Sequence, residues 1–186
     1  TECFLMPVLD HCARARDIGQ KGIKALILYP MNALASDQAG RLAELINTEK
    51  RLGGIRAGIY VGENGSHTGM GADHLIDDRH ALRDDPPDIL LTNYKMLDFL
   101  LLRREDRPLW ATTGPDSLRY VVLDEFHTYD GAQGTDVAML MRRLGATLGT
   151  AVPGAPLGEA APVATSATLG TDAAALVDLR DFAGKV

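Results

Sequence analysis

The stretch Ile23-Lys-Ala-Leu-Ile-Leu-Tyr29 decides the fold class of this chain. Every position after Lys24 is apolar, so a strand formed here would have two apolar faces. Continuous apolarity is typical of a buried strand in a parallel sheet, because helices cover both faces of such a sheet. Similar short runs occur at 55–61, 89–92, 120–123 and 163–166. The sequence therefore predicts a strand at each of these five places.

Segments with helical periodicity separate the strands. Residues at helical spacing share one face in each of three segments: Leu34, Gln38, Leu42, Leu45 and Ile46; Met96, Leu97, Leu100 and Leu101; and Val137, Leu140, Met141, Leu144 and Leu148. A further helix is expected at the N-terminus, with Pro7 bending it or lying in its first turns. This alternation predicts an α/β fold with a doubly wound, mainly parallel sheet flanked by helices. Strands continue beyond the Gly-rich loops at 62–72 and 149–162, so we expect a single domain over residues 1–186.

The composition is that of a globular domain with an excess of acidic residues. The 186 residues include 19 Lys and Arg against 25 Asp and Glu, a net charge of −6, which argues against a strongly basic nucleic-acid-binding module. Cys3 and Cys12 lie in one predicted helix, where a disulfide is geometrically implausible. We therefore expect a reduced, cytoplasmic setting. No apolar run reaches the roughly 18 residues needed to span a bilayer, so no membrane partner is expected.

The strongest candidate site is Arg119-Tyr-Val-Val-Leu-Asp-Glu-Phe-His127, where an apolar strand ends in two carboxylates. Open α/β sheets bind ligands at the carboxyl ends of their strands. Asp124 there would suit a Mg²⁺ ion, held directly or through water, and Glu125 would suit a base that orients and deprotonates a water attacking a γ-phosphate. The alternative is a strand that simply leaves the core through a polar turn.

A second candidate is Ala164-Thr-Ser-Ala-Thr168, which follows another buried strand. Its hydroxyls could hydrogen-bond a neighbouring carboxylate or His127 and so report nucleotide state. The alternative is a Ser/Thr turn that caps a following helix. The other four histidines lack the spacing of zinc ligands, so no zinc site is expected.

The order of these segments resembles the first RecA-like motor domain of superfamily-two, DEAD/DEAH-box-like helicases. Asp124-Glu-Phe-His127 resembles the Walker B box (motif II), and Ser166-Ala-Thr168 resembles motif III. Tyr29-Pro-Met-Asn-Ala-Leu-Ala35 and Leu91-Thr-Asn93 resemble motifs Ia and Ib, with Tyr60-Val-Gly62 as the strand-end glycine between them. The stretch from His127 to Asp136 is most similar to large bacterial Lhr-like and phage-defence helicases.

The resemblance implies an ATP site that uses Mg²⁺. Thr1 would be the last residue of a Gly-Lys-Thr phosphate loop, where its hydroxyl would ligate Mg²⁺ with Asp124. We therefore expect the Walker A Gly-Lys and a second RecA-like domain to lie outside these residues. The 186-residue chain alone is then expected to bind ATP poorly and to hydrolyse it negligibly. His127, Ser166 and Thr168 would couple nucleotide state to strand binding.

The resemblance also implies a face for DNA or RNA. Pro30, Asn32, Gly62, Thr92 and Asn93 would contact the phosphate backbone of one strand without reading its sequence. Met31-Asn32 departs from the Thr-Arg or Thr-Lys found in many members, which leaves the usual charge missing. Thr92 and Asn93 are also favoured helix N-caps. The Arg103-Arg104 and Arg142-Arg143 pairs fit solvated helix faces better than direct DNA contacts.

Two other functions remain open from the sequence. One is a RecA-like scaffold that binds partners without turnover, which the intact Asp124 and Glu125 disfavour. The other is an ATPase that acts on a protein, which the motif Ia and Ib segments disfavour. The leading prediction is the first motor lobe of an ATP-dependent helicase or translocase.

Overall fold

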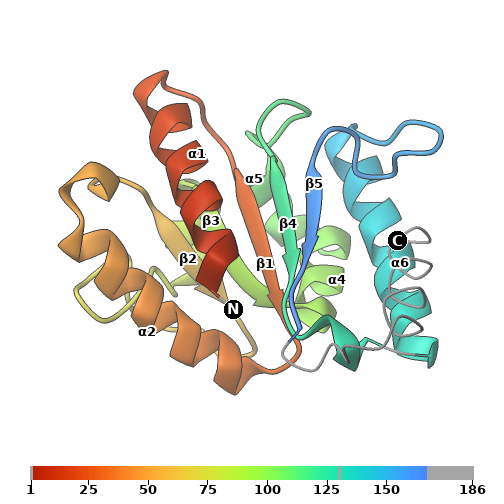
Figure 1. Ribbon diagram of the computed structural model, residues 1–186, viewed down its shortest axis with the longest axis horizontal. Helices are drawn as coiled ribbons and strands as arrows, with labels where there is room; N and C mark the ends of the chain where they lie inside the picture. The colour runs from red at the N-terminus through yellow and green to blue at the C-terminus, as the bar shows by residue number, and fades with distance from the viewer. Residues whose placement is uncertain (1, 130, 167–186) are drawn as a thin grey trace.

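The computed structural model describes residues 2–129 and 131–166, which contain a five-stranded sheet (Figure 1). The strand order is β2-β3-β1-β4-β5, and every neighbouring pair is parallel. The strands are β1 Ala25–Tyr29, β2 Ala57–Tyr60, β3 Ile89–Asn93, β4 Tyr120–Leu123 and β5 Ala161–Ala164. The predicted parallel α/β sheet is therefore confirmed.

Helices lie between consecutive strands. The α-helices are α1 Leu5–Asp17, α2 Asn32–Thr48, α3 Arg79–Asp84, α4 Tyr94–Leu102, α5 Arg107–Trp110 and α6 Gly131–Leu148. Short 3-10 turns are η1 Glu2–Phe4, η2 Lys50–Leu52, η3 Arg104–Asp106 and η4 Phe126–Thr128. Pro7 lies in the first turn of α1, where its missing N–H has no helical partner to lose, as expected. No helix in the described part of the chain is long and apolar enough to cross a membrane.

Two hydrophobic cores cover the two faces of the sheet. In Figure 1, α1 and α2 lie in front of the sheet, whereas α4, α5 and α6 lie behind it. Alternate residues of β1 serve the two cores: Ile27 packs with the front helices, and Leu26 and Leu28 pack with those behind. This is why the strand is apolar at every position.

The predicted face of α2 is only partly right. Leu42 and Ile46 are buried, but Leu34 and Leu45 lie half-buried at the flank. The buried stripe is instead made mainly of small residues: Ala35, Ala39, Leu42, Ala43 and Ile46. Small side chains allow the helix to approach the sheet closely, and a count of large apolar residues misses that stripe.

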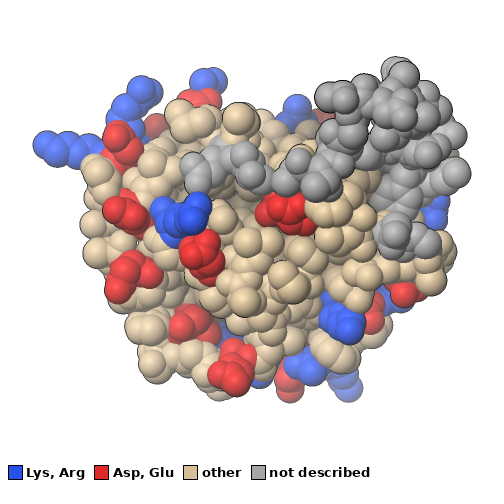
Figure 2. Space-filling view, turned by 60° about the horizontal axis from the view of Figure 1, so that its bottom comes forward, with Lys and Arg blue, Asp and Glu red and all other residues tan. Residues whose placement is uncertain are grey.

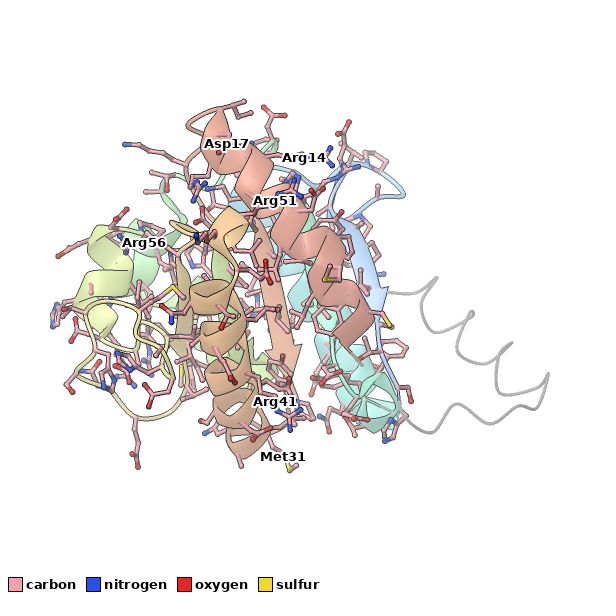
Figure 3. All side chains as sticks on the ribbon, turned by 60° about the vertical axis from the view of Figure 1, so that its left-hand side comes forward. Arg14, Asp17, Met31, Arg41, Arg51 and Arg56 are labelled. Atoms are coloured by element: carbon pink, nitrogen blue, oxygen red, sulfur yellow. The ribbon has the colours of Figure 1, made fainter. Side chains whose placement is uncertain are left out.

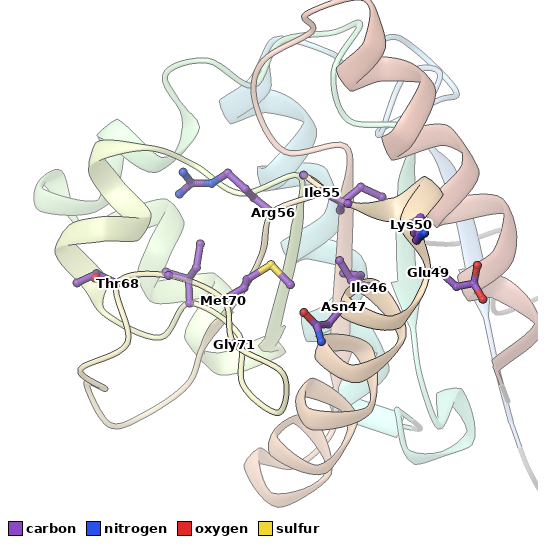
Figure 4. Close-up of a pocket in the computed structure, with 13 residues that line it drawn as sticks. Ile46, Asn47, Glu49, Lys50, Ile55, Arg56, Thr68, Met70 and Gly71 are labelled. Atoms are coloured by element: carbon purple, nitrogen blue, oxygen red, sulfur yellow. The ribbon is translucent and has the colours of Figure 1, made fainter.

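The Gly-rich segment after β2 is irregular, as predicted, but it folds back along that strand. Ile59 N–H donates to the Ile76 carbonyl at 2.8 Å, and Ile76 N–H donates to the Ala57 carbonyl at 3.2 Å. The Met70 sulfur accepts from Ala57 N–H at 3.0 Å. A hollow of about 380 Å³ remains between this loop and the C-terminal end of α2 (Figure 4). The loop thereby covers the exposed edge of β2.

Candidate functional site

The carboxylate pair lies at the C-terminal end of β4, as predicted. Asp124 is 4% exposed, and its backbone N–H donates to the Leu28 carbonyl of β1 at 2.9 Å. Its Oδ1 accepts a hydrogen bond from the Thr165 hydroxyl, just beyond β5. Asp124 is therefore fixed by the two strands on either side of β4.

Glu125 has an unusual backbone conformation. Its φ and ψ are 50° and 48°, and it is the one non-glycine residue with positive φ in the described ranges. The left-handed region costs a non-glycine residue about 1–2 kcal/mol. The Phe126 N–H donates to the Thr165 carbonyl at 2.8 Å, and the Thr128 hydroxyl donates to the Glu125 carbonyl at 2.8 Å. These bonds hold the turn, and strain of this kind is typical of functional sites.

His127 connects the ends of β4 and β5. Its Nδ1 lies 2.9 Å from the Ser166 hydroxyl and 3.4 Å from a Glu125 carboxylate oxygen. The predicted contact between His127 and Ser166 is thus present. Thr1 and Thr168 lie outside the described residues. The last strand was expected at 163–166 but ends at Ala164, so Ser166 stands in the loop at the sheet edge.

A hollow of about 610 Å³ borders the carboxylates. Asp124, Glu125 and Tyr29 line one side, and the first turns of α1 with part of α2 line the other. Burial, and then the charge of Asp124, raise the pKa of Tyr29 and of Tyr129 well above the usual range. Figure 3 shows Met31 and Arg41 at the same end of the molecule as the end of β1.

The donor set at this edge fits Mg²⁺. In the described part of the chain, no cluster of three or more His, Cys, Asp or Glu is placed to hold a metal ion. Mg²⁺ at nucleotide sites is held by one or two carboxylates together with waters and substrate phosphates, rather than by a cage of protein ligands. A buried Asp124 with Glu125 beside it supplies such a carboxylate set.

A second hollow, of about 400 Å³, is lined by most of the residues that were expected to contact a nucleic-acid strand. Pro30, Asn32, Gly62 and Asn93 all line it. The Asn93 side-chain amide donates to Asn32 Oδ1 at 2.5 Å, and Asn93 Oδ1 accepts from the Met96 N–H at 2.8 Å. Asn93 is therefore the N-cap of α4, as the alternative reading proposed, and it also lies at the hollow.

Thr92 does not join this group. Its side chain is fully buried, and its hydroxyl donates to the Tyr60 carbonyl of β2 at 2.6 Å. Thr92 was expected to contact a nucleic-acid strand directly. Its side chain is buried and cannot make that contact. The residue lies within β3, level with Leu28 and Tyr60, and it fixes β2 against β3.

The sequence analysis did not name several residues that the structure places at these sites. Thr165 was not named as a site residue, but its bond to Asp124 is the hydroxyl–carboxylate contact that was expected for the segment Ala164–Thr168. Tyr94, Lys95, Phe99 and Gln133 line the second hollow as well. Tyr94, Lys95 and Phe99 lie in the first two turns of α4, directly after β3. The position of a predicted helix directly after a predicted β-strand is the signal that could have found them.

The arginine pairs are partly engaged within the chain. Arg143 of α6 forms an ion pair with Asp98 of α4. The Arg103 guanidinium lies 4.7 Å from the centroid of the Phe99 ring. In Figure 2, which brings the C-terminal edge of the sheet forward, acidic and basic side chains are interspersed around uncharged surface. The part of this face that the structure describes shows no continuous basic patch, in keeping with the net charge.

A parallel sheet with paired carboxylates at the end of β4 and hydroxyls just beyond β5 is the arrangement expected of a RecA-like domain. Residues 1–176 match the model of the family described as DEAD/DEAH box helicase. The chain therefore belongs to the DEAD/DEAH box helicase family.

Two curated relatives and two solved proteins illustrate this membership. The chain is 25% identical to Druantia protein DruE of Escherichia coli (strain UMEA 4076-1), with 92% of this chain and 14% of the relative covered. It is 32% identical to the uncharacterized ATP-dependent helicase YprA of Bacillus subtilis (strain 168), with 77% and 16% covered. The chain thus spans less than a fifth of either relative's length.

Among solved structures, the DUF1998 helicase MrfA is 28% identical with a TM-score of 0.67, covering 97% of this chain and 24% of that one. A second MrfA structure, bound to DNA and AMPPNP, is 30% identical with a TM-score of 0.62, covering 91% and 20%. The fold is shared with the Mycobacterium smegmatis helicase Lhr, bound to ssDNA and AMP-PNP, at 23% identity and a TM-score of 0.61, covering 82% and 18%.

Proposed function

We propose that this chain is the first motor lobe of an ATP-dependent helicase or translocase that couples ATP hydrolysis to binding of a DNA or RNA strand. Family membership supports this, as do the name of YprA and the DNA-bound MrfA structure. The observation that carries the proposal is the 2.9 Å contact between His127 and Ser166, because it links the strand that ends in carboxylates to its neighbour. A second RecA-like domain of the same protein would complete the ATP site.

The carboxylate hollow would receive the phosphates of ATP. Asp124 and Thr1 would hold Mg²⁺, which when bound neutralises charge on the phosphate oxygens. Glu125 would accept a proton from the attacking water, and its left-handed turn presents the carboxylate beside the hollow. His127, with Ser166 and Thr168, would report the state of the phosphates to the rest of the lobe.

The second hollow would bind the DNA or RNA strand. Pro30, Asn32, Gly62 and Asn93 would contact its phosphate backbone through neutral groups, and the N-terminus of α4 would favour a phosphate there. Thr92 would support this hollow from within the sheet. Contacts of this kind are compatible with a net charge of −6. We place the protein in the cytoplasm.

The test is Glu125→Gln in the full-length protein. We expect ATP turnover to be abolished and ATP binding to be largely retained, because the amide keeps the shape and loses the base. Glu44→Gln, on the exposed side of α2, is the matched control and should leave turnover unchanged. Turnover by Glu125→Gln would overturn the assignment of the base. Stimulation of wild-type turnover by a nucleic-acid strand separates this function from an ATPase that acts on a protein.

A further inference from the structure

Phe99 is an aromatic residue in an unexpected position. It is 46% exposed, and among the Phe, Tyr and Trp side chains that the structure describes it is the only exposed one. It lies in the second turn of α4 and lines the same hollow as Asn32 and Asn93. Core packing does not account for it, since Met96, Leu97 and Leu100 are the residues of α4 that are buried against the sheet.

Basic side chains flank this ring along α4. Lys95 is exposed one turn before Phe99 and lines the same hollow. Arg103 follows one turn after it, in cation–π contact with the ring at 4.7 Å. The nearest acidic residue of the helix, Asp98, is engaged by Arg143. The surface around Phe99 therefore favours an anionic ligand.

The separation of Asn93 and Phe99 along α4 is on the scale of one nucleotide. Phe99 lies six positions after Asn93, a rise of about 9 Å along the helix axis. A phosphate at the N-terminus of α4 would thus leave its sugar and base within reach of Phe99. A protein partner would need a larger apolar core than this hollow supplies, where Tyr94, Met96 and Phe99 lie among polar residues. Aromatic rings that bind single strands stack against bases, and every base has a face to offer.

We propose that Phe99 is a base-stacking residue, which holds one base of a single strand in this hollow while Lys95 pairs with a neighbouring phosphate. This rests on the proposed function, and it adds a contact to the bases where the other residues contact only the backbone. The contact is tolerant of sequence, because stacking involves no hydrogen-bond readout.

The experiment compares two strands on the full-length protein: an oligothymidylate and an abasic strand of the same length, which keeps the phosphates and lacks the bases. Phe99→Ala should weaken binding of the oligothymidylate by about 5- to 150-fold and leave binding of the abasic strand unchanged. Phe99→Trp should retain the affinity. Leu102→Ala, an exposed apolar residue of the same helix that lies outside the hollow, should change neither.

The possible results distinguish a failure of base stacking by Phe99 from a failure of the proposed helicase function. Equal losses on both strands would overturn base stacking, because Phe99 would then act through the fold, the backbone or another domain. No loss on either strand would also overturn it and leave the helicase function standing. If the wild-type protein bound neither strand, the proposed function itself would fail. Phe99→Leu, which keeps an apolar side chain, should show the same base-dependent loss and guards against misfolding of the alanine variant.

Discussion

Replacement of Thr165 by valine removes one hydroxyl and keeps the shape of the side chain. In the folded chain this hydroxyl donates a hydrogen bond to Oδ1 of Asp124, a carboxylate that is 4% exposed. A buried carboxylate that loses a donor still carries the cost of its removal from water. We therefore expect Thr165→Val to lower the free energy of unfolding.

The magnitude follows from the charge of the acceptor. A hydrogen bond to an ionised group contributes about 1.5–3 kcal/mol. For a chain of this size each kcal/mol shifts Tm by about 2–4 °C, so Tm should fall by about 3–12 °C. The backbone bonds of Thr165, to Leu123 and from Phe126, do not involve the hydroxyl and remain. The loss in free energy of unfolding therefore reports on one hydrogen bond, from the Thr165 hydroxyl to Asp124.

The assay is urea unfolding followed by far-UV circular dichroism. Thr165→Ser keeps the donor and should lose clearly less than Thr165→Val. Thr48→Val is a matched control, because the exposed Thr48 hydroxyl donates only to the neutral Glu44 carbonyl at 2.8 Å. That variant should stay within about 0.5 kcal/mol of wild type. Equal losses for valine and serine at 165, or full stability of Thr165→Val, would refute the reasoning.

Three further predictions concern groups away from the site. Burial raises the pKa of the Cys12 thiol to about 12, so a disulfide reagent at neutral pH should modify the exposed Cys3 and reach Cys12 only on unfolding; equal rates would contradict this. The pKa of His11 is lowered from 6.5, mainly by burial. The contribution of neutral His11 to the free energy of unfolding is complete above pH 6.5 and is lost as the pH falls from there towards the folded-state pKa. Urea titrations should therefore show a steeper fall in the free energy of unfolding for wild type than for His11→Gln over this pH range. Asp106→Ala breaks an ion pair with Arg83 whose N–O distance is 2.7 Å and whose carboxylate side is fully buried. We expect a loss of about 3–5 kcal/mol in urea unfolding, and a loss below about 1 kcal/mol would show that the pair is solvated.

The sheet was predictable because burial on both faces leaves a signal at every residue. Ala25 to Tyr29 is apolar throughout, and the structure buries all five residues. The strand β5 was harder, because within the described residues it pairs with β4 alone and its residues are only partly buried or exposed. Its limits were therefore misplaced by two residues.

The site was predictable in its residue types and less so in its contacts. Asp124, Glu125, His127 and Ser166 stand out because polar residues follow apolar strands. The direction of the Thr92 side chain does not follow from the Leu91-Thr-Asn93 motif. A Thr near the end of a β-strand can be exposed at the second hollow or buried against the neighbouring strand. The register of β3 between β1 and β2 decides it, and register is a property of the assembled sheet.

The strand order divides the carboxyl edge into two halves that meet at β1. The carboxylates and the Thr165 and Ser166 hydroxyls lie just beyond β4 and β5, whereas the residues of the second hollow lie at or beyond the ends of β1, β2 and β3. Tyr29 lines the first hollow, and the next residue, Pro30, lines the second. Asp124 is itself hydrogen-bonded to β1 through the Leu28 carbonyl. Because β1 lies between β3 and β4, its end borders both hollows, whereas the residues that follow β2 border only the second.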